Sequence, residues 1–123
     1  MESLKSDDLT IAVSLLASGD YLLDWTGKSN ARDPAKVLIP FFDQVLQKAA
    51  GQKVEMHFER LEHFNSSTIA TLIHLINSAS HSGVPLRIFY DPNLRWQSLS
   101  FDALKRALRP FGTESRIEFV HAP

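Results

Sequence analysis

The fold of this chain is decided by residues 54–76, which read VEMHFERLEHFNSSTIATLIHLI. Val54, Met56 and Phe58 alternate with polar residues, a pattern typical of a β-strand with one buried face. Farther along, apolar residues recur at the i, i+3, i+4 and i+7 spacing of an amphipathic helix, at Ile69, Leu72, Ile73 and Ile76. We therefore predict a strand over 54–58, a loop over 62–65 and a helix over 67–80.

Similar signals precede this unit. Residues 9–17 and 21–25 are apolar and are separated by Ser18-Gly19-Asp20, which predicts an opening β-hairpin. Asp33-Pro34 predicts an N-cap followed by proline at the first helical position. The helix that follows would end near residues 50–51, and it must either kink or restart at Pro40.

The signals continue after this unit. Residues 85–90 are predicted to form a strand that ends in the turn cluster Asp91-Pro92-Asn93. A third helix follows and ends near residues 110–112, and residues 116–120 alternate as a last strand. The third helix is expected to bury Phe101, Leu104 and Leu108.

The predicted elements follow one another in the order β-β-α-β-α-β-α-β. Strands that alternate with helices imply crossover connections and a mostly parallel sheet. The opening hairpin adds an antiparallel pair and makes the sheet mixed. We therefore predict an α/β fold, a mixed and mostly parallel β-sheet flanked by helices, in a single domain that spans 1–123 with its core at about 9–119.

Composition excludes several classes of function. The sequence has no cysteine, which excludes disulfides, thiol chemistry and cysteine-ligated zinc. A formal net charge of −1 gives no global field that would attract a nucleic acid. The apolar runs are too short to cross a bilayer, and the acidic residues near the start are unlike a signal peptide. We expect a cytoplasmic protein with no nucleic-acid partner and no membrane insertion.

Patterns that would indicate catalysis are weak. The five glycines form no phosphate-binding loop, and no Gly-x-Ser-x-Gly elbow is present. The five histidines make no H-x-x-x-H pair, so surface histidines are a better interpretation than a metal site. Glu59 and Glu62 could act as an acid and base pair, but they are equally consistent with solvated carboxylates. We therefore predict no enzyme activity, no cofactor and no bound metal.

Four capping-type residues stand at the start of the 67–80 helix: Asn65, Ser66, Ser67 and Thr68. One capping side chain is enough for a helix N-terminus, so four exceed that need. The end of the helix also leaves unpaired backbone N–H groups and a partial positive charge. The stretch is either an ordinary N-cap with polar neighbours or a modification site, where a phosphate would keep the fold and change what docks there.

The stretch resembles the core motif of the STAS family, the domain of anti-sigma-factor antagonists. In that motif a hydrophobic strand precedes Asp-Ser-Ser/Thr-Gly-Leu, which opens a helix. Asn65-Ser66-Ser67-Thr68-Ile69 occupies the motif here, with Leu61 and Phe64 at the apolar positions before it. Thr26-Gly27-Lys28-Ser29-Asn30, predicted to be a loop, is similar to the family's Thr-Gly-Glu/Asp-Leu-Asp turn. This chain departs from the motif at Asn65, where the family has Asp, and at Thr68, where it has Gly.

The resemblance implies a bacterial signalling regulator that binds a protein partner through this helix N-terminus and switches partners when Ser66 is phosphorylated, with Ser67 and Thr68 as alternates. The implied partners are a GHKL-type serine kinase, acting as an anti-sigma factor, and a PP2C-type phosphatase. Partner contacts are expected from Asn65, Ser66, Ser67 and Thr68, and from Thr26 and Asn30.

Two alternatives remain open. One is a STAS-like adaptor subunit of a larger signalling or transport assembly, without phosphorylation. The other is a small binder of an anionic ligand at the same helix N-terminus. The sequence also leaves open a homodimer.

Arg95 and Trp96 are a second candidate contact. They follow Asp91-Pro92-Asn93 in a predicted loop, and tryptophan and arginine are over-represented at interface hot spots. We predict that both are partly exposed and contact a partner, with a Trp96 folded onto the core as the alternative. Trp25, at the end of a predicted internal strand, is expected in the core.

Overall fold

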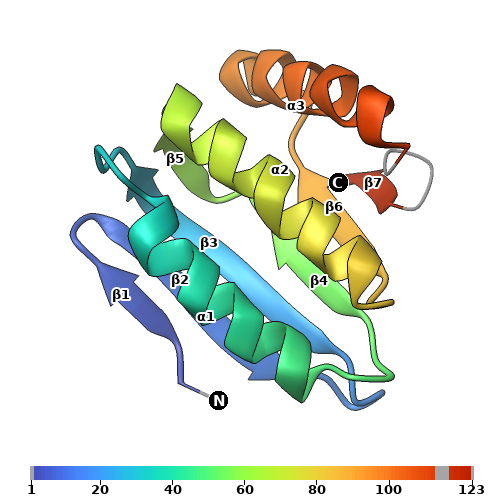
Figure 1. Cartoon of the computed structure of the whole chain (residues 1–123). Helices are drawn as coiled ribbons and strands as arrows, with labels where there is room; N and C mark the ends of the chain where they lie inside the picture. Colours follow the sequence, from blue (N-terminus) through green and yellow to red (C-terminus); the bar gives the residue numbers. More distant parts are fainter. Residues whose placement is uncertain (1, 113–116, 123) are drawn as a thin grey trace.

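The computed structural model describes residues 2–112 and 117–122 of the chain. Within these residues a seven-stranded sheet carries three helices on one face (Figure 1). The strands are β1 (Leu4–Ser6), β2 (Leu9–Leu15), β3 (Tyr21–Ser29), β4 (Val54–His57), β5 (Leu61–Phe64), β6 (Leu86–Tyr90) and β7 (Ile117–His121). The helices are α1 (Ala35–Lys48), α2 (Ser66–His81) and α3 (Arg95–Leu108), which continues into the 3₁₀ turn η1 (Arg109–Phe111).

The sheet is mixed and mostly parallel, as the sequence predicts. Its strand order is β1-β2-β3-β4-β6-β7, and β5 pairs with β3 beyond the end of β4. The pairs β1–β2 and β2–β3 are antiparallel, and β2–β3 is the predicted opening hairpin. The pairs β3–β4, β3–β5, β4–β6 and β6–β7 are parallel. The predicted fold class is therefore confirmed.

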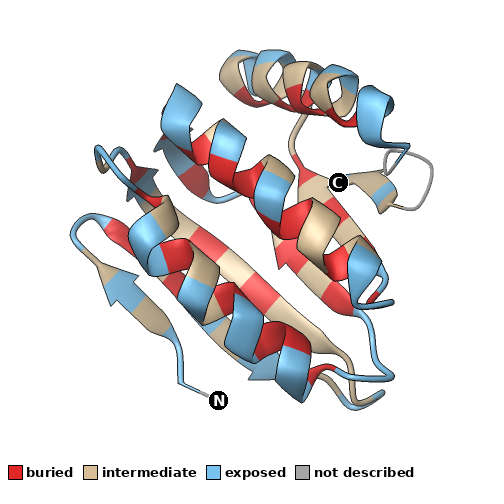
Figure 2. Ribbon diagram, in the orientation of Figure 1, coloured by how far each residue is buried: buried red, intermediate tan, exposed pale blue. Residues whose placement is uncertain are grey.

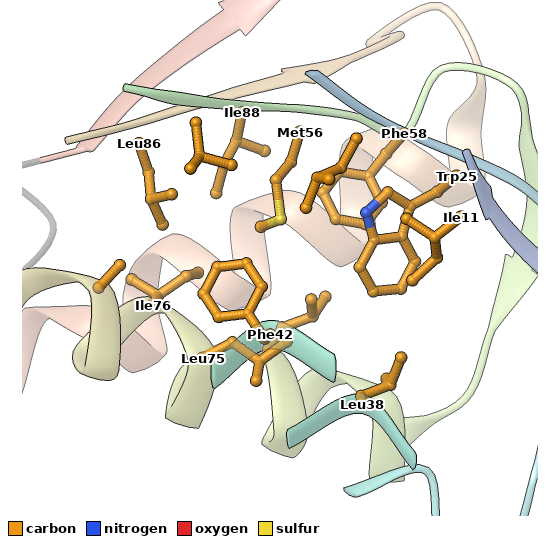
Figure 3. Close-up of a cluster of buried hydrophobic side chains, with 14 of the residues drawn as sticks. Ile11, Trp25, Leu38, Phe42, Met56, Phe58, Leu75, Ile76, Leu86 and Ile88 are labelled. Carbon is orange, nitrogen blue, oxygen red and sulfur yellow. The ribbon is translucent and has the colours of Figure 1, made fainter. Parts of the chain in front are cut away.

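The core lies between the sheet and the three helices (Figure 2). Along β4 and just beyond it, Val54, Met56 and Phe58 are fully buried, as their alternation predicts. They meet apolar side chains of α1 and α2, among them Phe42 and Leu75, in one continuous cluster (Figure 3). Apolar burial of this kind is the dominant favourable term in folding, so this cluster fixes where the helices sit.

No described helix covers the opposite face of the sheet, although parallel strands are usually covered on both faces. Charged side chains of neighbouring strands pair with one another there. Arg87 donates to Glu55 at 3.3 Å and to Glu118 at 3.0 Å. The His57 ring stacks on Phe89, with 4.1 Å between ring centroids. These side chains reach from one strand to the next. Because the charged ones form ion pairs, this face of the sheet can be exposed to solvent without a covering helix.

Two short strands were not predicted. β1 has only three residues, and β5 occupies most of the predicted loop at 62–65. In β5, Leu61 and Phe64 are buried and the two residues between them are exposed, so a period-2 pattern is missing.

The predicted loop over 26–30 is wrong, because β3 continues to Ser29 through a bulge between Gly27 and Lys28. Gly27 has φ 85°, and a Cβ there would overlap the carbonyl oxygen of Asp8. Lys28 N–H donates to that same oxygen at 3.0 Å. Only glycine fits this close approach of two backbones.

The helix boundaries also differ from the predictions. Pro34, not Asp33, is the N-cap of α1, and its side chain makes no capping hydrogen bond. α1 runs continuously through Pro40, which lies on its exposed side. α2 begins at Ser66, so Ser66 is helical and does not belong to the preceding loop.

In the apolar stripe of α2, Leu72 and Ile76 are buried, whereas Ile69 and Ile73 are half-buried. The third helix buries Phe101, Leu104 and Leu108, as predicted. β7 corresponds to the predicted last strand, whose first residue, Arg116, lies outside the described residues. Within the described ranges, every helix is too short or too polar to cross a membrane.

Candidate functional site

The start of α2 is held at the end of β3. β5 runs parallel to the second half of β3, with Ser29 in register with Phe64, and α2 begins directly after β5. Asn65 N–H donates to the Ser29 carbonyl at 3.1 Å, which extends this pairing by one bond. The N-terminus of α2 therefore lies beside the residues that follow β3.

Asn65 caps α2 and ties it to the loop after β3. Its Oδ1 accepts from the Thr68 backbone N–H at 2.9 Å, and its Nδ2 donates to the Ala31 carbonyl at 2.9 Å. An aspartate would keep the first bond but has no N–H for the second. An amide therefore fits this position better than the acid that the resembled motif carries.

Thr68 lies beneath the cap and is fully buried. Its Oγ1 lies 2.8 Å from Asn65 Oδ1, 2.7 Å from Ser29 Oγ and 3.2 Å from the Ser29 carbonyl oxygen. The hydroxyl has one proton, so when it donates to Asn65 the Ser29 hydroxyl donates to it. Thr68 thus locks α2 onto β3, and in this structure its hydroxyl is not presented to solvent.

Ser66 and Ser67 are exposed on the first turn of α2. Within the part of the chain that the structure describes, neither hydroxyl makes a hydrogen bond. The backbone N–H groups of both residues precede the first helical bond and point outward from the helix end. The site thus presents two free hydroxyls at the positive end of a 16-residue helix.

The other predicted contacts divide into two groups. Asn30 is exposed directly after β3 and adjoins Ala31, so the structure brings it to the start of α2. Thr26 lies before the bulge, in register with Thr10 of β2. Side chains alternate along a strand and Trp25 faces the helices, so Thr26 faces the opposite side of the sheet. The structure does not bring Thr26 to the site.

Arg95 and Trp96 belong to the first turn of α3, so the loop predicted for them is wrong. Arg95 is exposed and Trp96 is half-buried. The Trp96 ring packs edge-on against Phe64, with 5.3 Å between centroids. Because Phe64 directly precedes Asn65, the starts of α2 and α3 are neighbours on one end of the molecule (Figure 1). Trp25 is 1% exposed, which confirms its place in the core.

The site is a surface and not a deep pocket. A cavity of about 30 Å³ adjoins it, between α1, the turn from β1 to β2, and the end of β3 with the residues that follow it. It has room for about two water molecules. Much of its lining is aliphatic and comes from Leu9, Pro34, Val37 and Leu38. Over residues 2–112 and 117–122, no group of three histidine or acidic side chains is placed to hold a metal ion.

Two residues that organise the site were missed by sequence reasoning. Ser29 fell in the segment predicted to be a loop, and Ala31 acts through its backbone carbonyl, which has no signature in the side chain. Both contacts join residues far apart in the chain, 39 positions for Ser29 with Thr68 and 34 for Ala31 with Asn65. Local patterns carry no signal for such pairs.

Comparisons with known proteins show the fold but no family. No protein-family model matches the chain, and no curated protein sequence matches it. Among solved structures, the chain is similar to the crystal structure of apo-SiaC from Pseudomonas aeruginosa, with 14% sequence identity and a TM-score of 0.54. The similarity covers 100% of each chain. At this identity it establishes a shared fold alone.

Proposed function

We propose that this protein is a non-catalytic signalling regulator that binds a protein partner through the first turn of α2 and is switched by phosphorylation of Ser66. One observation carries the proposal: Ser66 and Ser67 stand exposed on a helix end that buried contacts of Thr68 hold in place. The resemblance of residues 65–69 to the STAS motif and the fold shared with SiaC support it.

A phosphate on Ser66 would change binding more than folding. The free N–H groups and the positive end of α2 favour an anion there. The added charge of roughly −1.5 to −2 would face a partner whose contact surface fits a neutral hydroxyl. As the resemblance implies, a GHKL-type kinase would add the phosphate and a PP2C-type phosphatase would remove it.

A second candidate is an adaptor that binds its partner without phosphorylation. The residue at position 65 favours it. The motif places an aspartate, and so a negative charge, beside the phosphoacceptor, whereas Asn65 is neutral and its Nδ2 donates to the Ala31 carbonyl. The third candidate, a binder of a small anionic ligand, has less support, since the adjoining cavity is small and largely aliphatic.

The first test maps phosphate on the protein isolated from its own cells. Peptide mass spectrometry should find a phosphorylated fraction with the phosphate on Ser66. A phosphate on Ser67 or Thr68 would show that the acceptor is misassigned. Phosphorylation of Thr68 would in addition require that its buried hydrogen bonds to Ser29 and Asn65 break first.

The second test uses variants as bait in quantitative pull-downs. Ser66→Ala should recover the partner as the parent does, and Ser66→Asp should lose it, because an unmatched charge in a desolvated contact is costly. Ser67→Ala is the matched control, since it removes an equally exposed hydroxyl one residue away. Ser66→Asp should fold normally, because a charge at a helix N-terminus is favourable by about 0.3–1 kcal/mol. Equal partner recovery with Ser66→Ala and Ser66→Asp would refute the switch and favour the adaptor.

A further inference from the structure

β7 is the outermost strand on one side of the sheet. Over the residues that the structure describes, it pairs only with β6, so its other edge carries unpaired backbone groups. The outermost strand on the other side, β1, has only three residues and carries Lys5. A short strand and an edge lysine both disfavour pairing with another chain. β7 has five residues, among them half-buried Ile117, Phe119 and Val120. It is therefore the longer and more apolar of these two outer strands.

The hydrogen bond that follows the end of β7 fixes which groups of the strand face outward. Ala122 N–H donates to the Tyr90 carbonyl of β6 at 2.8 Å. In a parallel pair, alternate residues of a strand bond to the same neighbour. The residues of β7 that alternate with Ala122 therefore direct their N–H and C=O groups away from β6. They are Ile117, Phe119 and His121.

This pattern is symmetric about Phe119. A second copy of β7, laid antiparallel, would present the same three residues in reverse order. A twofold axis at Phe119 would then pair Phe119 with Phe119 of the partner subunit and Ile117 with His121 of the partner subunit. Each such pair exchanges two hydrogen bonds, so every outward group finds a partner. We propose that the chain forms a homodimer through this antiparallel pairing of β7, which continues the sheet across both copies.

The side chains are compatible with this register. Glu118 would lie opposite Val120 of the partner subunit, so no like charges face one another directly. The formal net charge of −1 adds little repulsion between copies.

The first measurement is the molar mass in solution. Light scattering after size-exclusion chromatography should show a mass that rises with concentration from 13.9 kDa toward twice that value. A monomer at every concentration would overturn the proposal. A dimer alone would not identify the surface, so the register must be tested directly.

Disulfide trapping tests the register, and the chain has no cysteine of its own to interfere. Residues 118 and 120 of two copies would form a non-hydrogen-bonded pair with Cα atoms about 4.5 Å apart, within the range of a disulfide. Two copies of residue 118 would be about 7–8 Å apart, beyond that range. A mixture of Glu118→Cys and Val120→Cys should therefore give a covalent dimer under mild oxidation, and each variant alone should not.

Val120→Cys should melt like the parent, and Glu118→Cys should melt only slightly lower, because it loses an exposed ion pair with Arg87. Trapping of equal yield in either variant alone would overturn the register. So would failure of the mixture to link while the protein is dimeric.

Discussion

Replacing Thr68 by valine would test how the start of α2 is held. The change keeps the shape of the side chain and removes the hydroxyl that lies 2.7 Å from Ser29 Oγ and 2.8 Å from Asn65 Oδ1. Ser29 is 3% exposed, so its hydroxyl would be left buried without a partner. An unsatisfied buried group of this kind costs about 1–3 kcal/mol, which is the loss we expect in the free energy of unfolding.

The double variant Ser29→Ala/Thr68→Val measures the coupling energy between the two hydroxyls. Ser29→Ala alone leaves the Thr68 hydroxyl with fewer partners and should also destabilise the fold. Removing both hydroxyls leaves neither of them unpaired, so the double variant should cost less than the sum of the singles by about 1 kcal/mol. Urea denaturation followed by tryptophan fluorescence measures all three.

Thr71→Val is the matched control on the same helix. Its Oγ1 donates to the Ser67 carbonyl, within one turn of α2. Ser67 is exposed, so that carbonyl can bond to water after the change, and we expect a loss below about 1 kcal/mol. Additive costs for Ser29→Ala and Thr68→Val, or an effect of Thr68→Val no larger than that of Thr71→Val, would refute the reasoning.

Two further predictions concern the backbone and the tryptophans. Gly27→Ala should lower the free energy of unfolding by more than about 2 kcal/mol, because the added Cβ would overlap the Asp8 carbonyl at φ 85°. Gly83→Ala, at φ 70° with open space around it, should cost only about 1 kcal/mol in a urea melt, and equal costs would contradict the close approach at Gly27. Iodide should quench only the fluorescence of half-buried Trp96, so a Trp96→Phe variant should resist quenching. Quenching that persists in that variant would show that Trp25 is accessible.

The sequence predicts the parts of the fold that rest on local periodicity. Alternation at Val54, Met56 and Phe58 identified β4, and the break at Gly19 identified the β2–β3 hairpin. β5 was missed because Leu61 and Phe64 are buried three positions apart, which matches neither a strand nor a helix pattern. The continuation of β3 through Gly27 was missed for a related reason. A glycine that permits two backbones to approach has the same local signature as a glycine in a turn.

The candidate site was predictable only in its exposed half. Capping chemistry at Asn65 followed from the sequence, and the exposed hydroxyls of Ser66 and Ser67 follow from the helix start. The buried half depends on Ser29 and Ala31, which reach the site through the parallel pairing of β3 and β5. The phosphorylation of Ser66 stays a prediction.

β3 is the one described strand flanked by three others, and this has a consequence for the order of folding and of local opening. Its first partner, β2, is reached through residues 16–20, a short loop with a low entropic cost of closure. Its pairing with β4 must wait until the chain has passed through α1. Of the three pairings of β3, the one with β5 is the shortest, with three register pairs and a bulge, so it is the one of the three expected to open first in the native state. The start of α2 therefore follows directly on the shortest of the three pairings of β3, and local opening of that pairing is expected to leave β2, β3 and β4 paired.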